Sequence, residues 1–383
     1  MLSPGLQAVL AGHHPTPYLA LDPAVARDRL RTLRAAFGDA AILYAVKACP
    51  EPAVLRALVA EGAGFDVASQ QEIELCLAAG ADPTVLQHGN PVRGPGAAAR
   101  AAAAGIRRFV TDSAEDVDAL AAEVPGARVQ VRLIVDDSGS ATPFHGKFGA
   151  LPGEAVALLH RIRERGLVAA GVTFHAGSQQ TRPQTYAHAI GTALTVAGRV
   201  GLRRPELDLG GGWPVAYRSA VPGPEVFAAA VRAAVAAAVA AGRVDDVTLL
   251  LEPGRALAAP AGVLRTTVLR VSRRPGVDHR RWVYLDVGRY QGLAETEGEA
   301  LAYPVRAPDR SGPPGPAVLA GPTCDGDDVI YRRTPVALPM DLAAGDVLDL
   351  LGTGAYTSSY ASVGFNGFGP LRVVVAGREP GTP

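Results

Sequence analysis

Lysine is nearly absent from this 383-residue sequence, which contains only Lys47 and Lys147. Lys47 directly follows the apolar run Leu43–Val46. Lysine, unlike arginine, can lose its proton near neutral pH, so a desolvated lysine in this position is suited to Schiff-base chemistry with an aldehyde cofactor. From position alone, a surface lysine at the end of a strand is an equally good interpretation.

Cysteine, net charge and long apolar runs are also scarce. Cys49, Cys76 and Cys324 form no CxxC pair and no zinc-like group with histidine, so we expect a reducing compartment and no bound metal. The formal net charge is zero, which argues against nucleic acid or an anionic membrane as a partner. The alanine-rich stretch 227–241 is interrupted by Arg232, and no signal peptide is evident. These absences favour a cytoplasmic protein that acts on a small molecule.

The first two thirds of the chain alternate short apolar segments with longer helical ones, as in parallel strands joined by crossover helices. Strands are predicted at 42–47, 64–68, 84–87, 107–111, 128–135, 168–174, 206–209 and 247–252. Helices are predicted at 52–61, 70–79, 97–104, 113–122 and 227–241. Eight such units favour a (β/α)8 barrel with its active site at the carboxyl ends of the strands, and a doubly wound sheet is the alternative.

The remainder of the chain has a different pattern, with β-rich segments separated by turns of glycine, proline and aspartate. Strands are predicted at 263–271, 281–287, 317–320, 347–351 and 371–375, with an exposed loop at 308–316. The first fifteen residues are expected to pair with this part or to precede it. We therefore predict a barrel domain over residues 16–258 and a β-rich domain from residues 1–15 and 259–383.

Two motifs at predicted strand ends could complete a pyridoxal phosphate site around Lys47, which also needs a phosphate cradle and a partner for the pyridine nitrogen. The run Asp208–Trp213 contains three glycines whose N–H groups could approach an anion, although a tight turn has the same composition. Glu252 could face the ring nitrogen and Arg255 could bind phosphate. A surface Glu–Arg pair is the simpler interpretation of that motif.

Two further motifs carry reactive side chains. His175 and Ser178 follow the sixth predicted strand and could stack on a cofactor ring and bind phosphate, although a lone histidine is more often structural. Cys324 and Asp325 lie in a predicted turn of the β-rich part, where an inert buried cysteine is the usual alternative.

Taken together, the motifs resemble the ornithine/diaminopimelate/arginine decarboxylase family, the fold-type III pyridoxal-phosphate-dependent decarboxylases. The resemblance extends from about Thr16 to Val375 and is closest to the ornithine and lysine decarboxylases. The motifs, in order, are Tyr44–Lys47, Phe65–Ser69, His175–Ser178, Gly210–Gly212, Glu252–Arg255, Gly321–Gly326, Gly354–Tyr356 and Phe365–Phe368.

This resemblance implies an alanine-racemase-like (β/α)8 barrel, a C-terminal Greek-key β domain, and a homodimer whose active sites lie at the subunit interface. Pyridoxal 5'-phosphate would be bound covalently by Lys47, with Glu252 at the pyridine nitrogen and His175 stacked on the ring. The other cofactor-binding residues implied are Asp66, Arg132, Ser178, Gly211, Gly212, Arg255 and Tyr356.

The resemblance also implies the reaction. The substrate amine would displace Lys47, the α-carboxylate would leave as CO2, and Cys324 of the second subunit would govern reprotonation at Cα. Asp325 would bind the distal amine, and Tyr290 and Phe365 would complete the substrate site. The order Cys-Asp-Gly is similar to the ornithine/lysine branch, so we expect a diamine-forming decarboxylase of polyamine biosynthesis.

Other functions remain open. Tyr290 is followed by Glu295–Glu299 without a clear counterpart of the second aspartate of ornithine-type enzymes, and Gln179 after His-Ala-Gly-Ser is closer to other branches. A larger substrate, such as meso-diaminopimelate, carboxynorspermidine or a conjugated biosynthetic intermediate, is therefore the first alternative. A non-catalytic regulatory homologue is the second, although it would be expected to lose Lys47 or Cys324. A racemase would ordinarily have arginine in place of Glu252.

Overall fold

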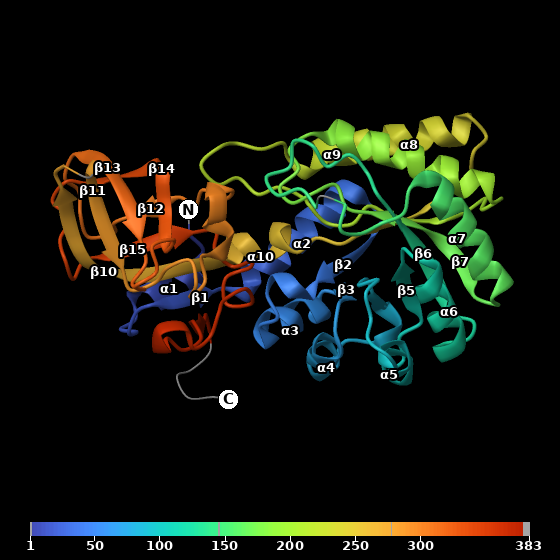
Figure 1. Cartoon of the computed structure of the whole chain (residues 1–383), viewed down its shortest axis with the longest axis horizontal. Helices are drawn as coiled ribbons and strands as arrows, with labels where there is room; N and C mark the ends of the chain where they lie inside the picture. Colours follow the sequence, from blue (N-terminus) through green and yellow to red (C-terminus); the bar gives the residue numbers. More distant parts are fainter. Residues whose placement is uncertain (1, 145, 277, 378–383) are drawn as a thin grey trace. The chain divides into compact units, whose positions relative to one another are not determined.

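The computed structural model describes residues 2–144, 146–276 and 278–377. The chain forms two compact units (Figure 1), each described here by itself. The barrel unit comprises Arg27–Pro214 and Val221–Ala256, and the β-rich unit comprises Met1–Ala26, Val215–Ala220 and Leu257–Pro383.

The barrel unit contains a closed sheet of eight parallel strands in sequence order (Figure 1). The strands are β2 (Ala41–Ala45), β3 (Gly64–Val67), β4 (Leu86–His88), β5 (Arg108–Thr111), β6 (Arg128–Leu133), β7 (Val168–Phe174), β8 (Glu206–Asp208) and β9 (Thr248–Leu251). The barrel closes where Ala41 and Ile42 of β2 pair with β9. The predicted barrel is therefore confirmed, and the alternative of a doubly wound sheet is wrong.

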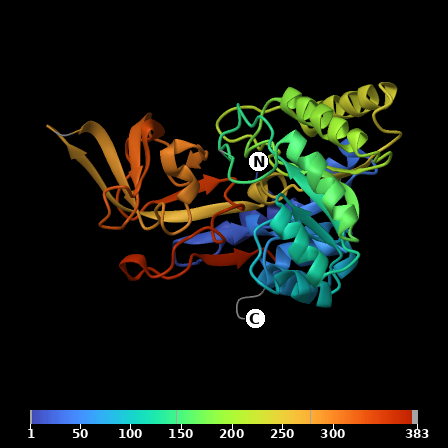
Figure 2. The same ribbon diagram turned by 45° about the vertical axis from the view of Figure 1, so that its right-hand side comes forward.

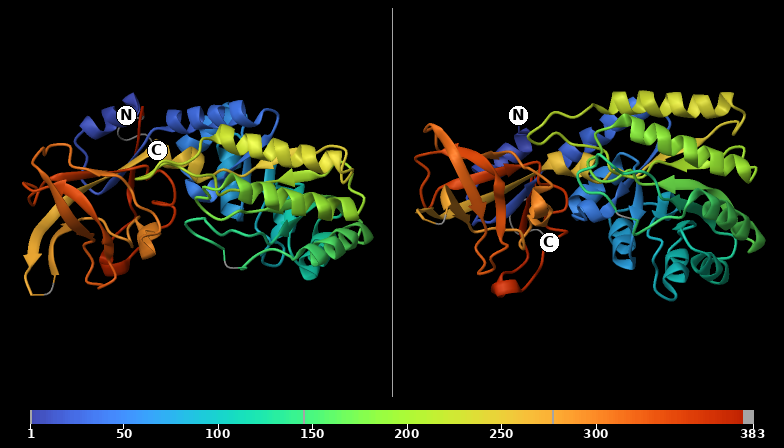
Figure 3. Two further views of the ribbon diagram at one scale, coloured as in Figure 1. Left: turned by 90° about the horizontal axis from the view of Figure 1, so that it is seen from above. Right: turned by 45° about the horizontal axis from the view of Figure 1, so that its top comes forward.

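Helices cover the outside of this sheet, and α8 and α9 lie side by side (Figure 3). The helices that follow the first barrel strand are α3 (Pro52–Ala60), α4 (Gln70–Ala78), α5 (Ala97–Ala103), α6 (Ala114–Glu123), α7 (Pro152–Glu164), α8 (Pro183–Arg199) and α9 (Pro224–Ala240). Ser69 and Ser113 cap α4 and α6 by accepting hydrogen bonds from backbone N–H groups of the first turn. Gly80 and Gly105, with φ of 92° and 102°, follow α4 and α5 and allow the chain to turn away there.

Two barrel strands lose predicted residues to 3-10 turns. β2 stops at Ala45, and Lys47 lies in the short 3-10 helix η1 (Val46–Ala48). β4 begins only at Leu86 because Pro83–Val85 forms another 3-10 turn, η2, in which the Asp82 carboxylate accepts a hydrogen bond from Thr84 N. A side-chain cap supports the turn before β4, whereas η1 after β2 has none among the described residues.

The β-rich unit is built on one mixed sheet (Figure 2) with the strand order β12-β15-β10-β11-β13-β14, and β1 pairs with both β10 and β16. Its strands are β1 (Tyr18–Leu21), β10 (Gly262–Arg274), β11 (Asp278–Leu285), β12 (Val305–Arg306), β13 (Pro314–Ala320), β14 (Val329–Pro339), β15 (Val347–Leu351) and β16 (Arg372–Val375). Two pairings are parallel, β1 with β16 and β11 with β13.

The N-terminal residues require a correction. The expected domain boundary at residue 16 is wrong because β1 is hydrogen-bonded along its whole length to β10 and β16. The preceding residues form helix α1 (Pro4–Ala11), whose buried residues Leu6 and Val9 pack in one cluster with Tyr18. The next helix, α2 (Pro23–Phe37), runs across the boundary between the two units.

The other corrections concern the edge of the sheet. The loop predicted at 308–316 ends at Pro313, since Pro314 already begins β13. Strand β14 was missed because its sequence contains Arg332 and Arg333 among the apolar residues. The buried guanidinium of Arg281 on β11 donates to the Leu338 and Pro339 carbonyls at 2.8 and 2.6 Å and so helps to hold the end of β14. Among the described residues, no helix has the length and apolar character to cross a membrane.

Candidate functional site

Lys47 lies beside a buried carboxylate at the carboxyl end of the first barrel strands. Its Nζ is 3.4 Å from Oδ2 of Asp66 on β3, and the lysine side chain is half exposed. Burial raises the pKa of Asp66, and the positive charges of Lys47 and Arg132 oppose that rise. The pair gives an accessible amine with a fixed neighbour of opposite charge.

A second acidic group lies at the ends of β8 and β9. Glu252 follows β9, and its Oε1 accepts a hydrogen bond of 2.7 Å from Nε2 of Gln87. The same nitrogen donates to Oδ2 of Asp208 at 2.9 Å. Burial, together with the neighbouring charges of Asp208 and Asp66, raises the pKa of Glu252 well above its ordinary range.

His175 directly follows β7 and is partly buried. Its Nδ1 accepts a hydrogen bond from Gly177 N at 3.1 Å, which leaves Nε2 to carry the hydrogen of the neutral ring. Burial is the main cause of a pKa well below the ordinary histidine value, and Arg132 and Lys47 add to the effect. A Cβ on Gly211 would lie 2.9 Å from Nε2, so only glycine leaves that position clear. His175 is therefore a neutral, fixed imidazole.

The glycine run and Arg255 form a cradle suited to an anion. Gly210 and Gly212 have φ of 63° and 92°, and a Cβ on Gly212 would lie 2.2 Å from the Gly177 carbonyl oxygen. Arg255, at the start of α10 (Arg255–Ala258), contacts Ser178 Oγ through Nη2 at 3.4 Å. The backbone N–H groups, a hydroxyl and a guanidinium thus come together in one place.

Arg132 on β6 completes the predicted barrel set. Its guanidinium lies 5.6 Å from the ring centre of Phe144 and 4.9 Å from that of Phe148. The ring of Phe144 also lies edge-on to the ring of His175, with 4.6 Å between the two ring centres. Nine of the predicted residues therefore lie in the barrel unit, in the last residues of its strands or in the segments after them: Lys47, Asp66, Arg132, His175, Ser178, Gly211, Gly212, Glu252 and Arg255.

The remaining five predicted residues lie in the β-rich unit. Cys324 and Asp325 are exposed, and Asn366 Oδ1 accepts a hydrogen bond from Cys324 N at 3.2 Å and lies 3.5 Å from its Sγ. The rings of Tyr290 and Phe365 are 4.8 Å apart. Asp325 helps to raise the pKa of Tyr290. The structure thus groups these four residues around neighbouring loops.

Tyr356 is half-buried in the turn after β15 and has a φ of 54°. It belongs to the β-rich unit, whereas the other predicted phosphate ligands belong to the barrel unit. Its contact with phosphate stays a prediction.

The glutamate stretch after Tyr290 forms the 3-10 segment η4 (Ala294–Glu299). The Glu299 carboxylate accepts hydrogen bonds from backbone N–H groups of three consecutive β14 residues, the first of which is Arg332. Glu297 is largely exposed and pairs with Arg289 at 3.3 Å. Glu299 is therefore committed to holding β14.

Sequence reasoning missed Gln87 and Asn366 as parts of the site. Gln87 is 1% exposed in the middle of β4, and a polar residue inside a short barrel strand was the available signal. Asn366 has a φ of 51° between Gly364 and Gly367, and its partner Cys324 is 42 residues away, so no local pattern points to the contact.

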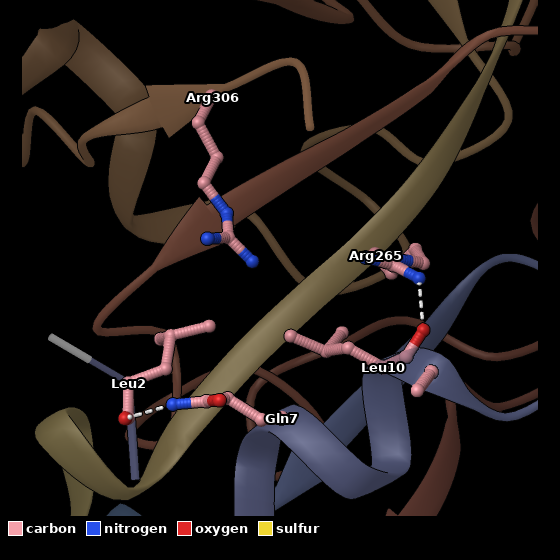
Figure 4. A pocket seen from close by; sticks show the side chains of 6 residues that line it. Leu2, Gln7, Leu10, Arg265 and Arg306 are labelled. Carbon is pink, nitrogen blue, oxygen red and sulfur yellow. Dashed lines mark hydrogen bonds between the residues drawn. The ribbon is translucent and has the colours of Figure 1, made fainter. Parts of the chain in front are cut away.

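A pocket of about 430 Å3 in the β-rich unit (Figure 4) contains none of the predicted residues. Two arginines line it, Arg265 and Arg306, and both bind the buried carboxylate of Asp349. Arg265 also donates to the Leu10 carbonyl. These contacts give the arginines a structural role.

Comparison with known proteins finds decarboxylases by sequence and by structure. Residues 24–259 match the pyridoxal-dependent decarboxylase family, pyridoxal binding domain. A lysine/ornithine decarboxylase from Selenomonas ruminantium is 33% identical over 94% of this chain and 89% of its own length. A diaminopimelate decarboxylase from Actinosynnema pretiosum is 34% identical over 95% of this chain and 85% of its own. The crystal structure of a lysine/ornithine decarboxylase from Vibrio vulnificus with cadaverine has a TM-score of 0.85 and 32% identity, and the match covers 99% of this chain and 100% of that one.

Proposed function

Because this chain belongs to the pyridoxal-dependent decarboxylases, we propose that it converts L-ornithine, L-lysine or both to the corresponding diamine and CO2. The single observation that supports this most is the grouping of Lys47, His175 and Glu252 at the strand ends of one barrel. An amine, a neutral imidazole and a partly buried carboxylate are the groups that a pyridoxal phosphate ring needs around it.

The residues present fit this cofactor. The cradle of Gly211, Gly212, Ser178 and Arg255 offers N–H, hydroxyl and guanidinium donors to a phosphate, and side chains larger than glycine would fill it. When bound, pyridoxal phosphate supplies an aldehyde for covalent attachment and a ring that accepts the electrons left by the departing CO2.

Each barrel side chain then has a definite task. Lys47 provides the amine for covalent attachment, with Asp66 holding it in place. His175 presents the face of a ring that its Gly177 hydrogen bond keeps in one orientation. Glu252 binds the pyridine nitrogen, and a carboxylate there favours the protonated ring.

Residues of the β-rich unit bind the side chain of the substrate. We assign the distal amine of the substrate to Asp325, because a charge-assisted hydrogen bond contributes about 1.5–3 kcal/mol and separates substrates with and without that amine. Cys324 beside it is the group that governs reprotonation at Cα. Tyr290 and Phe365 line the same substrate site.

A homodimer with shared active sites follows from this assignment, with Cys324 and Asp325 supplied by the second copy. Both residues are exposed in the single chain. The loop between β15 and β16 also exposes Tyr360 and Val363, whose relative exposures of 58% and 66% are high for apolar side chains. We also place the protein in the cytoplasm and its diamine product in polyamine synthesis.

A larger amino acid is the second candidate substrate. The Actinosynnema relative named diaminopimelate decarboxylase is as similar to this chain as the lysine/ornithine decarboxylase. Glu299, moreover, gives its carboxylate to β14, so this residue does not serve as a second acidic partner beside Asp325. Both observations favour testing substrates with a longer or more polar side chain.

A competition experiment distinguishes the two candidates. The purified, cofactor-loaded protein is incubated with equal amounts of L-ornithine, L-lysine, L-arginine, meso-diaminopimelate and carboxynorspermidine, and the products are identified by mass. Putrescine or cadaverine as the main product supports the proposal. The diaminopimelate is supplied with a 13C label, so that lysine formed from it differs in mass from the added lysine. Labelled lysine, or norspermidine, supports the larger substrate. Loss of CO2 from none of the five would contradict both.

A further inference from the structure

Gln87 and Asp208 of the barrel unit both contact Glu252, and neither belongs to the predicted cofactor set. Gln87 is 1% exposed and Asp208 is fully buried. Gln87 Nε2 donates to Glu252 Oε1 at 2.7 Å and to Asp208 Oδ2 at 2.9 Å. A primary amide has two N–H hydrogens, so Gln87 commits both of them to these two carboxyl groups.

The two carboxyl groups also act on each other's pKa. The charge of Asp208 raises the pKa of Glu252, whereas hydrogen bonding with the Glu252 side chain lowers that of Asp208. Asp208 Oδ1 accepts a further hydrogen bond of 2.9 Å from Gly210 N. Burial is the main cause that raises the pKa of both groups. The pKa of Glu252 is raised more strongly than that of Asp208, so Glu252 is the group that holds a single proton bound by the pair.

Charged groups from four elements act on the pKa of Glu252 in opposite directions. Lys47 from η1 and Arg132 from β6 favour the carboxylate, whereas Asp66 from β3 and Asp208 from β8 oppose it. Gln87 from β4 is an uncharged side chain whose N–H groups stabilise the ionised form of both carboxyl groups.

We propose that Gln87 and Asp208 are positioning residues that fix the orientation and the proton content of Glu252. Gln87 holds one Glu252 oxygen and favours its negative charge, while the charge of Asp208 favours a proton on Glu252. The balance between these two neighbours sets the protonation state in which Glu252 faces the pyridine nitrogen. This inference rests on the proposed placement of Glu252 at that nitrogen.

Gln130 offers a matched control. It lies on β6 in the same barrel, is 2% exposed and donates through Nε2 to the buried Glu206 at 3.0 Å. Glu206 begins β8, whereas Asp208 ends it, and Glu206 is not a predicted cofactor residue. Gln130→Leu therefore removes an equivalent buried amide without touching Glu252.

The test uses the full chain, stripped of cofactor and titrated with pyridoxal phosphate. Two properties are measured for each variant: the dissociation constant of pyridoxal phosphate, and the pH midpoint of the acid-side change in the visible spectrum of the bound cofactor. Gln87→Leu is expected to weaken binding about tenfold or more, the effect of one lost hydrogen bond to a charged group. Its midpoint should move to higher pH, since the Glu252 carboxylate loses a donor.

Asp208→Asn should move the midpoint the other way, to lower pH, because it removes an opposing charge and adds an N–H donor. Gln130→Leu should leave both properties at the wild-type values. Opposite shifts are not expected from mere damage to the fold. Gln87→Met, which keeps an unbranched side chain, replaces Gln87→Leu if the latter does not fold.

Glu252→Gln separates failure of this inference from failure of the proposed function. If Glu252→Gln changes both properties while the Gln87 and Asp208 variants match Gln130→Leu, or if these two shift in the same direction, the inference is overturned and the proposed function stands. If Glu252→Gln behaves as wild type, Glu252 does not face the cofactor, and both are overturned.

Discussion

The loop that carries Cys324 and Asp325 is held by one buried carboxylate, that of Asp328. Its Oδ2 accepts hydrogen bonds from Thr323 N at 3.1 Å and Thr323 Oγ1 at 2.7 Å, and its Oδ1 accepts one from Arg289 N at 2.8 Å. The carboxylate is 2% exposed, so water cannot readily replace these donors. Asp328→Asn should therefore loosen the loop.

The loss of stability in Asp328→Asn follows from the number of hydrogen-bond acceptor oxygens on the side chain. An amide has a single acceptor oxygen, so the side chain introduced by Asp328→Asn would direct its NH2 group at either the Thr323 or the Arg289 N–H. One charge-assisted hydrogen bond of about 1.5–3 kcal/mol is lost, and a buried donor left unsatisfied costs about 1–3 kcal/mol more. We expect a loss of roughly 3 kcal/mol, which accelerates hydrogen exchange in the loop about a hundredfold if the loop opens locally.

The assay combines urea unfolding with hydrogen exchange of a peptide that contains Thr323. Asp327→Asn is the control, because Asp327 is the exposed neighbour of Asp328 and a surface substitution should change the unfolding free energy by less than about 0.5 kcal/mol. Turnover of the Asp328→Asn protein should fall as well, since the loop carries Cys324. If both variants exchange and unfold alike, Asp328 does not hold this loop.

Two further predictions concern the barrel unit. Borohydride reduction followed by mass spectrometry should find the cofactor attached to the wild-type protein and to Lys147→Arg, but not to Lys47→Arg. The Lys47→Arg side chain keeps the positive charge beside Asp66 but cannot form the covalent bond. Attachment in Lys47→Arg would contradict the role of Lys47. Burial lowers the pKa of His88 to about 4, so the unfolded chain binds protons more readily than the folded one, and stability should fall as the pH drops below about 6.5. Urea unfolding should give an unfolding free energy that is lower at pH ~5 than at pH ~7, by about 2 kcal/mol attributable to His88. His88→Leu should make the unfolding free energy less dependent on pH. An unchanged pH dependence would mean that His88 is not buried in its neutral form.

Much of the barrel could be predicted because its strands are short, apolar and separated by helices with clear caps such as Ser113 and clear ends such as Gly105. The β-rich unit was harder. β14 interrupts its apolar residues with Arg332 and Arg333, and its stability depends on contacts from Glu299 and Arg281, which lie far away in the sequence. A pattern confined to one segment contains no trace of such partners.

Some residues of the candidate site could likewise be predicted from the sequence, and others could not. Motifs at strand ends identified residues such as Lys47 and Glu252, because in a barrel every strand delivers its last residues to the same end. Gln87 and Asp328 were not identified as site residues. Their importance depends on hydrogen bonds to partners brought together only by folding, and neither belongs to a recognisable motif.

The position of β1 has a consequence for synthesis of the chain. Tyr18 of β1 pairs with Arg372 of β16, a residue about 350 positions later. At translation rates of roughly 5–20 residues per second, β1 leaves the ribosome some 20–70 s before that partner exists. Throughout this interval an apolar strand, Tyr18–Leu21, has an open edge that can pair with other nascent chains. Expression yield should therefore depend on chaperones that bind this segment until β10 and β16 have been made.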